Sequence, residues 1–405
     1  MSIRRRRGPI AFLQAALCAA FLSVALPAAA QSIALPQGHA WLSMPASLLP
    51  MRLPIDAAPD WTVQATAGDF EAVDATPVRA LAGDWGRYTP RDGRNVALQS
   101  ARVEALAVRQ GWEVAAVLHS DILIKGSRGA FDLLHAYKQR QTPADGSEFA
   151  LWARETGVVW AGLRGARSWV LRPGTDSGLQ LSGALTLLSV RRVQRVDASG
   201  QAQFNSGGLG DSFDAQALRQ DSHQQFGGQG RRDANGGGYT ADLGLLWQPS
   251  AATFVNLSAV DLLSRLRVNG VSTQQNTLSS STRSLDTNGY LNYKPLLIGR
   301  NSSERMAFRL SPKWSASVGR RIAWASGETL AGARWERVDD LDLPALWAVL
   351  PVAPGLLLQL DGEIRFRSIG IGLQSRHGAL MLRTRSLPVG QSHALGWQAA
   401  FTLPL

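Results

Sequence analysis

The last twelve residues, ALGWQAAFTLPL (394–405), alternate between apolar and small or polar side chains. A repeat of two residues is the period of a β-strand, in which successive side chains point to opposite faces. One face of this segment is therefore apolar, and it carries Leu395, Trp397, Ala399, Phe401, Leu403 and Leu405. The chain ends in a strand with one apolar face, and the rest of the sequence must supply its neighbours.

The first thirty residues have the pattern of a secretory signal peptide. Residues 4–7 are arginines, residues 10–26 form a short apolar stretch, and residues 28–30 are the small residues that precede a cleavage site. We expect cleavage near Ala30 and export from the cytoplasm. A membrane anchor is the alternative, but the apolar stretch is short and ends at Pro27.

Export combined with an apolar, aromatic final strand resembles the ending of a bacterial outer-membrane β-barrel. Cys18 is the only cysteine and lies inside the expected signal peptide. The exported chain then contains no cysteine, which excludes disulfides, thiolate metal sites and cysteine nucleophiles. We expect no cofactor.

Charge and hydropathy narrow the fold further. The net charge is +11, yet the arginines are scattered through strand-like segments rather than clustered on a helix, so we expect no nucleic-acid partner. The longest apolar run after the signal, residues 343–358, is interrupted by Pro344, Pro351 and Pro354. A membrane protein without spanning helices must be a closed barrel. A soluble periplasmic β-protein remains the alternative.

Residues 31–94 contain seven prolines and have weak periodicity, apart from a short strand-like stretch at 61–67. Because this segment precedes the first convincing strand, it could enter the barrel lumen as a plug, or it could form a periplasmic tail. We place the barrel itself at residues 95–405.

Fourteen strands fit the alternation in the remaining chain. Treating 305–325 as one strand despite Pro312 keeps Met306, Phe308, Leu310 and Trp314 on one face and returns the last strand to the periplasm. The expected strands are 96–109, 112–124, 149–163, 168–171, 179–196, 239–248, 254–268, 285–297, 305–325, 329–338, 356–360, 363–374, 379–386 and 393–403.

The lengths of the connections predict which end of the barrel lies outside the cell. Residues 199–238 and 269–289 are polar stretches on either side of a hairpin with a short turn at Pro249. Outer-membrane barrels have long extracellular loops and short periplasmic turns. We therefore expect both polar stretches to lie outside the cell as exposed loops. We also expect a bulge near Asp261, where the apolar face changes, and a short helix at 130–138.

The stretch YTADLGLLWQP (239–249), followed by Asn256-Leu257 and Asp261-Leu262, is similar to hairpins of the long-chain fatty-acid transporter superfamily of outer-membrane barrels. Fourteen strands with an N-terminal plug is also the layout of that family. The match covers about thirty residues and includes no ligand-site motif, so no functional residues are transferred. The resemblance implies transport of apolar molecules.

Three features could carry chemistry. His119-Ser120-Asp121 suggests a hydrolase, but in a strand Ser120 points away from the other two side chains, so a polar lumen face is the simpler interpretation. The carboxylates of residues 339, 340 and 342 could hold calcium or form a solvated turn. Eight tryptophans fit interfacial girdles or a soluble core: Trp152, Trp160, Trp169, Trp247, Trp314, Trp324, Trp335 and Trp397.

Arginine is the main candidate for the lumen, because an arginine on the lipid face costs ~2–4 kcal/mol at the membrane midplane. The lumen candidates are Arg365, Arg367, Arg383, Arg385, Arg320 and Arg334. They could form an anion-attracting wall, or they could pair with acids such as Asp361 and Glu363, or lie at a barrel rim.

The sequence therefore predicts an outer-membrane channel or transporter for small molecules, with anionic and amphipathic ones as candidates. A structural or secretion partner without a ligand is the alternative, and a lipid hydrolase is a third; we expect no enzyme. The expected partners are outer-membrane lipids, an unidentified small-molecule ligand, and the barrel-assembly machinery, which would bind the last strand.

Overall fold

The computed structural model describes residues 47–49, 51, 53, 61–81, 83, 85–172, 177–205, 211–223, 235–280, 283–285, 288, 291–293, 297–324 and 327–405. The expected signal peptide and its cleavage site lie outside these residues. No helix in the described part of the chain has the length and hydropathy needed to cross a membrane.

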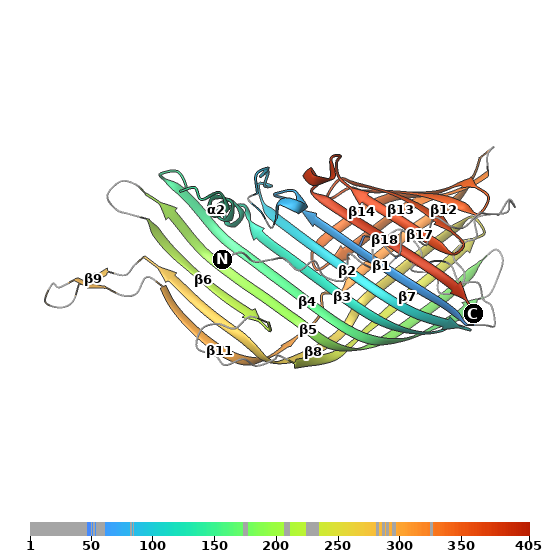
Figure 1. Cartoon of the computed structure of the whole chain (residues 1–405), viewed down its shortest axis with the longest axis horizontal. Coiled ribbons are helices and arrows are strands. Elements are labelled where there is room, and N and C mark those ends of the chain that lie inside the picture. The colour runs from blue at the N-terminus through green and yellow to red at the C-terminus, as the bar shows by residue number, and fades with distance from the viewer. Residues whose placement is uncertain are drawn as a thin grey trace, which may run out of the picture.

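Fourteen antiparallel strands form a closed barrel (Figure 1), which confirms the expected fold class. The closure is made by β1, which pairs with β18 from Thr62 opposite Pro404 to Ala72 opposite Ala394. In order around the barrel the strands are β1 (Thr62–Val73), β2 (Arg94–Arg109), β3 (Trp112–Ser127), β4 (Ser147–Arg172), β5 (Gly178–Phe204), β7 (Asn235–Ser250), β8 (Thr253–Ser279), β12 (Lys313–Trp324), β13 (Gly327–Val338), β14 (Leu341–Ala353), β15 (Leu356–Glu363), β16 (Ser368–Ser375), β17 (Gly378–Thr384) and β18 (Ala394–Pro404).

The expected strand number is confirmed, but its members differ. Strand β1 lies inside the segment that we expected to precede the barrel, so the barrel begins at Thr62 rather than at residue 95. Strand β14 was missed because it contains Pro344 and Pro351; a register shift follows Pro351 in its pairing with β15. The two expected strands at 149–163 and 168–171 are one strand, β4. Of the expected strand at 285–297, the described residues before Leu297 form no barrel strand.

The barrel is apolar outside and charged inside. Outward-facing leucines and isoleucines are exposed on most strands, among them Leu118, Leu163, Leu187, Leu263, Leu346, Ile371 and Leu382. Inward-facing ionisable side chains are buried, among them Glu104, Glu113, Arg164, Lys313, Arg334, Glu336, Asp361 and Arg383. A soluble protein has the opposite pattern, so this surface fits a lipid environment.

The last strand follows the same rule. Phe401 and Leu403 are 41% and 50% exposed, whereas Gln398 and Thr402 are buried and contact other lumen-side groups. The predicted facing of the terminal strand is therefore confirmed.

Exposed tryptophans lie near both ends of the barrel. Trp61, Trp112, Trp169 and Trp247 are at the end that carries the short turns and the C-terminus, and Trp314 and Trp335 are near the opposite end. The guanidinium groups of Arg109 and Arg167 lie over the rings of Trp61 and Trp112, at 5.8 and 4.4 Å. This arrangement is typical of an interfacial girdle. Trp160, in contrast, is buried in the lumen.

Strands β4, β5 and β8 run far beyond the other barrel strands and form a wall above the opposite end of the barrel (Figure 1). Two further strands complete this wall. Strand β6 (Ser212–Asp221) lies between β5 and β8 above the end of β7, and β11 (Leu297–Phe308) pairs with β8. The polar stretches at 199–238 and 269–289 are thus partly strand rather than wholly loop.

A helix, a two-stranded hairpin and two short 3-10 turns complete the described elements. Helix α2 (Arg128–Gln139) confirms the predicted short helix, and its N-cap, Ser127, also bonds the edge of β4 through Ala150 O and Trp152 N. Strands β9 (Arg283–Leu285) and β10 (Leu291–Tyr293) form a separate hairpin. Short 3-10 turns, η2 (Val78–Ala80) and η3 (Val389–Gln391), lie in rim connections.

The expected single strand at 305–325 is interrupted at residues 309–312, although β11 and β12 both pair with β8. Pro312 has no N–H to donate to a ladder, which fits this break. Met306 and Leu310 are buried in the lumen, whereas Trp314 and Val318 face outward. The prediction that Met306 and Leu310 share a face with Trp314 was wrong, because the break shifts the alternation.

Candidate functional site

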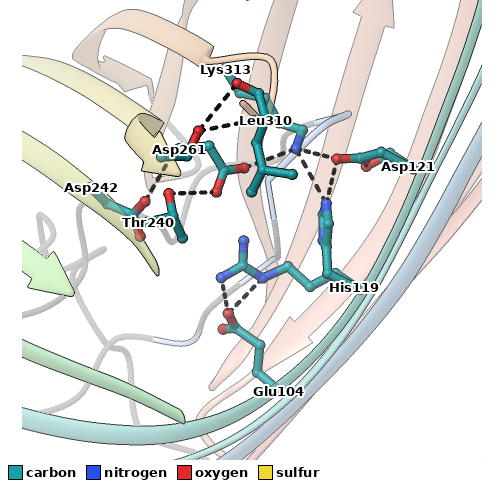
Figure 2. A network of polar contacts seen from close by, with 11 residues as sticks. Glu104, His119, Asp121, Thr240, Asp242, Asp261, Leu310 and Lys313 are labelled. Carbon is teal, nitrogen blue, oxygen red and sulfur yellow. Dashed lines mark hydrogen bonds and ion pairs between the residues drawn. The ribbon is translucent and has the colours of Figure 1, made fainter. Parts of the chain in front are cut away.

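A network of charged side chains crosses the lumen where the wall meets the barrel (Figure 2). Lys313 of β12 is its centre and its side chain is buried. Its Nζ lies 2.5 Å from Asp121 Oδ2 on β3 and 3.3 Å from Asp261 Oδ2 on β8. Along the barrel wall, four strands separate β3 from β12 on one path and eight on the other. The ion pair between Lys313 and Asp121 is therefore a bridge across the lumen.

His119 completes the bridge on the β3 side. Its Nε2 lies 2.6 Å from Asp121 Oδ2 and 3.2 Å from Lys313 Nζ, and its ring packs 5.3 Å from that of Trp160. His119 and Asp121 share a face because they are two residues apart in a strand.

A backbone bulge positions Asp261. Its φ of 59° is in the left-handed region, and the β7–β8 register shifts at this point. The Asp261 N–H donates to Asp242 Oδ1, and Asp261 Oδ1 accepts from Thr240 Oγ1, both at 2.9 Å. These contacts hold the carboxylate toward Lys313, and the bulge predicted near Asp261 is confirmed.

A second layer of charges lies beside this bridge. Arg164 of β4 is buried among Glu113 at 3.2 Å, Asp242 at 3.4 Å and Glu104 at 3.9 Å. Arg102 pairs with Glu104 through its Nε at 2.6 Å. Because Asp242 contacts both Arg164 and the Asp261 backbone, the two layers form one network.

The opposite side of the lumen holds a separate network on β13, β15 and β17. Arg334 pairs with Glu336 at 3.1 Å and Asp361 at 2.7 Å, and Arg383 pairs with Asp361 at 2.5 Å. Glu363, also buried, accepts hydrogen bonds from the N–H groups of Arg365 and Phe366. Each buried arginine is matched by at least one carboxylate.

The described N-terminal residues contact this second network. The N–H groups of Ser47 and Leu48 donate to Glu336, and Arg383 donates to Ser47 Oγ. Leu49 and Leu53 accept from lumen-facing Gln398 and Gln64. Residues 62–73 form barrel strand β1 and are no plug. Whether the residues before β1 act as a plug stays a prediction, since most of residues 31–60 lie outside the described part of the chain.

An apolar cluster lies next to the charged bridge. Its members come from the lumen faces of β2, β3, β4, β5, β8 and β11, with Leu310 from the segment after β11; they include Trp160, Val190, Leu266, Val268, Met306 and Leu310. The lumen thus carries apolar and charged side chains next to one another, and both groups are buried among other protein side chains.

The arginines singled out from the sequence lie in three kinds of place. Arg334 and Arg383 are buried in the second network. Arg365 forms a two-bond pair with Asp74 at the rim, both bonds 2.7 Å long, while Arg367 and Arg385 are exposed in rim segments. Arg320 is exposed on β12, on the outward side of the barrel. Whether any of them affects anion preference stays a prediction.

The possible hydrolase trio at residues 119–121 and the carboxylates near residue 340 have other surroundings in the structure. Ser120 lies on the opposite side of β3 from His119 and Asp121, so the three form no hydrolase triad. Asp339 and Asp340 accept from Lys125, and Arg94 donates to Asp340. Burial raises the pKa of Asp340, but the hydrogen bonds and charges of Lys125 and Arg94 outweigh it and lower the pKa below its usual value. Within the described residues, no group of three or more His, Cys, Asp or Glu side chains could hold a metal ion.

Sequence reasoning missed Lys313 and Asp261 as lumen residues. A signal was present on β3, where Glu113, His119, Asp121 and Lys125 all occupy odd positions and so share one face. Four ionisable side chains on one face of an apolar strand indicate a lumen surface. Lys313 also lies on the face opposite the apolar Trp314, but it is a single charged residue there, and no local pattern indicates that it meets Asp121 across the lumen.

No protein-family model matches the chain, and none of the curated proteins does. Solved structures do match. The toluene transporter TodX of Pseudomonas putida is 10% identical, with 92% of this chain and 98% of that chain covered and a TM-score of 0.39. A Pseudomonas aeruginosa FadL homologue is 10% identical over 88% and 94%, with a TM-score of 0.30. The Escherichia coli outer-membrane protease OmpT is 8% identical over 87% and 99%, with a TM-score of 0.23.

These matches include the barrel family that the sequence resembled. The likeness concerns the fold alone, because the identities are about 10% and the TM-scores are below 0.5. The function is therefore derived from the lumen itself.

Proposed function

We propose that the chain is an outer-membrane channel or transporter whose lumen is closed in the described conformation and opens when the charged bridge rearranges. The observation that carries this proposal is the ion pair between Lys313 and Asp121, which crosses the lumen of a closed barrel. Ionisable residues inside a membrane protein are costly and usually mark a pathway for substrate or ions. A general porin would keep this space open for water.

An amphipathic small molecule is the substrate class that the lumen supports best. The apolar cluster around Trp160 and Met306 adjoins the bridge at His119, so one molecule could contact both kinds of surface. The two networks contain five basic side chains (Arg102, Arg164, Lys313, Arg334 and Arg383) and eight acidic ones (Glu104, Glu113, Asp121, Asp242, Asp261, Glu336, Asp361 and Glu363). This excess of acids does not favour an anion path.

The proposal is tested by conductance in planar lipid bilayers. We expect the wild-type barrel to conduct weakly, and Lys313→Ala to raise the conductance or the frequency of opening, because it removes the central cation of the bridge. Lys138→Ala, which changes an exposed lysine on α2, is the control and should behave as the wild type.

A structural or secretion partner is the second candidate, and the wall above the barrel favours it, since transport alone requires no such extension. If Lys313→Ala folds as the wild type does and remains non-conducting, the channel proposal fails and this second function gains support.

A further inference from the structure

The wall carries a pocket of about 300 Å³ on strands β4, β5, β6 and β8, well away from the lumen networks. Its lining includes Trp152, Arg154, Arg195, Asp197, Gln216 and Gln275. The pocket thus combines one indole ring with charged and amide side chains.

The strand register places these side chains on the face that continues the lumen surface. Trp152 and Arg154 lie six and four residues from Val158, a lumen-facing residue of the same strand, and even spacing keeps them on one side. Arg154 is directly opposite Asp197. Across β6, Gln275 is opposite Leu218, which is opposite Asp197. The lining side chains of these neighbouring strands therefore point to the same side of the wall.

A clamped carboxylate organises the pocket. Arg154 Nε and Arg195 Nε donate to the two oxygens of Asp197, each at 2.7 Å. The two arginine side chains are 55% and 43% exposed. Within the part of the chain that the structure describes, their terminal amino groups have no further partner. Two arginines and one aspartate leave the clamp with one excess positive charge.

These groups match the chemistry of a sugar acid. The indole of Trp152 offers a flat apolar face for the C–H side of a sugar ring, and the glutamine amides can bond hydroxyl groups. The terminal amino groups of Arg154 and Arg195 suit a carboxylate, which guanidinium groups bind through paired hydrogen bonds. We propose that this pocket binds an acidic oligosaccharide, one whose rings carry carboxylates.

The neighbourhood supports a ligand longer than one ring. Arg300 of β11 is directly opposite Gln275, so a further exposed cation lies beside the pocket on the same face. The wall stands at the end of the barrel opposite the short turns, which in outer-membrane barrels is the cell exterior. The site goes beyond the channel function and does not depend on it.

The test is binding of hexagalacturonate and of maltohexaose, its neutral counterpart in chain length, to the purified full-length protein in detergent, measured by calorimetry. We expect hexagalacturonate to bind and to bind more weakly as salt increases, with little binding of maltohexaose. Trp152→Ala and the double variant Arg154→Gln/Arg195→Gln should each weaken the affinity by roughly tenfold or more. Heat-modifiable gel mobility verifies that each variant is folded.

Matched controls come from the opposite face of the same wall. Leu151→Ala is adjacent to Trp152, and Arg219→Gln replaces an arginine on the outer side of β6. Both should bind as the wild type does. Absence of hexagalacturonate binding, equal binding of maltohexaose, or unchanged binding by folded Trp152→Ala protein would overturn the proposal.

A competition experiment distinguishes two sources of acidic sugars, a lipid headgroup and a free polysaccharide. Vesicles that contain lipopolysaccharide are added to the hexagalacturonate complex, with lipopolysaccharide-free vesicles as the reference. Displacement supports the proposal with the acidic sugars of a lipid headgroup as the source, and persistence of the complex supports it with a free polysaccharide as the source.

Discussion

Lys313 and Asp121 lie on strands far apart in the barrel, yet Lys313 Nζ is 2.5 Å from Asp121 Oδ2 inside the lumen. Both residues belong to a network in which each charge has an opposite partner. In a low-dielectric interior such a network is favourable only while it is complete. Changes to single members should therefore have large and coupled effects.

Replacing Lys313 by methionine should destabilise the barrel, because Asp121 and Asp261 would keep buried charges without their cation. The expected loss is about 3–5 kcal/mol in the free energy of unfolding, measured by urea titration in lipid vesicles. The double variant Lys313→Met/Asp121→Asn should lose less than the sum of the two single variants. Additive losses would show that the two residues do not interact.

Changing Phe401 to aspartate should block membrane insertion. The side chain faces outward on β18, so the change removes an aromatic group from the lipid surface and adds a charge there. The measurement is the amount of heat-modifiable folded protein in the outer membrane, with Phe401→Leu as the control. Normal levels of Phe401→Asp would mean that the facing of β18 is misassigned.

Gly319 should tolerate no side chain. An added Cβ would lie 2.5 Å from the Phe254 ring and 2.7 Å from the Trp347 ring, two buried rings that pack against each other. We expect Gly319→Ala to cost about 1–3 kcal/mol of folding free energy. Gly390→Ala is the control, since nothing lies within 4 Å of its added Cβ. A wild-type unfolding midpoint for Gly319→Ala would contradict this packing.

Asp340 should stabilise the rim in a pH-dependent way. Its pKa is lowered in the folded protein, since Lys125 and Arg94 outweigh the effect of burial. A lowered folded pKa gives stability that is fully present above the unfolded value of about 3.9 and is lost as the pH falls through the folded value. The stability difference between wild type and Asp340→Asn should thus be constant near neutral pH and shrink below about pH 4. A difference that grows on acidification would refute the pairing.

The two-residue alternation was enough to predict a closed barrel and the facing of β18, because lipid selects an apolar face on every strand. The alternation did not identify strands that contain prolines or that lie outside the lipid. Strand β14 contains two prolines, and the wall strands are rich in Gln, Ser and Gly because they lie beyond the barrel. The total of fourteen is nevertheless correct. The two unexpected barrel strands, β1 and β14, offset the expected strand at 168–171, which is part of β4, and the expected strand at 285–297.

The lumen networks were only half predictable. Arg334 and Arg383 were found as lumen candidates because arginine is costly in lipid, and their pairing with acids was one of the alternatives. Lys313 was not singled out, although the alternation already places it on the opposite face of β12 from the outward-facing Trp314; the break at residues 309–312 changed the facing of Met306 and Leu310 instead. Which strands meet across a lumen depends on barrel closure, and no local pattern encodes it.

Proximity of residues 121 and 313 across the lumen is the most direct test of the closed channel. Cys18 is the only native cysteine, so Asp121→Cys/Lys313→Cys can be treated with a short bifunctional thiol reagent in folded, membrane-inserted protein. We expect an intramolecular cross-link, while the outward-facing neighbours in Leu118→Cys/Trp314→Cys should not be linked. Cross-linking of the outward pair, or none of the 121–313 pair in folded protein, would contradict the bridge.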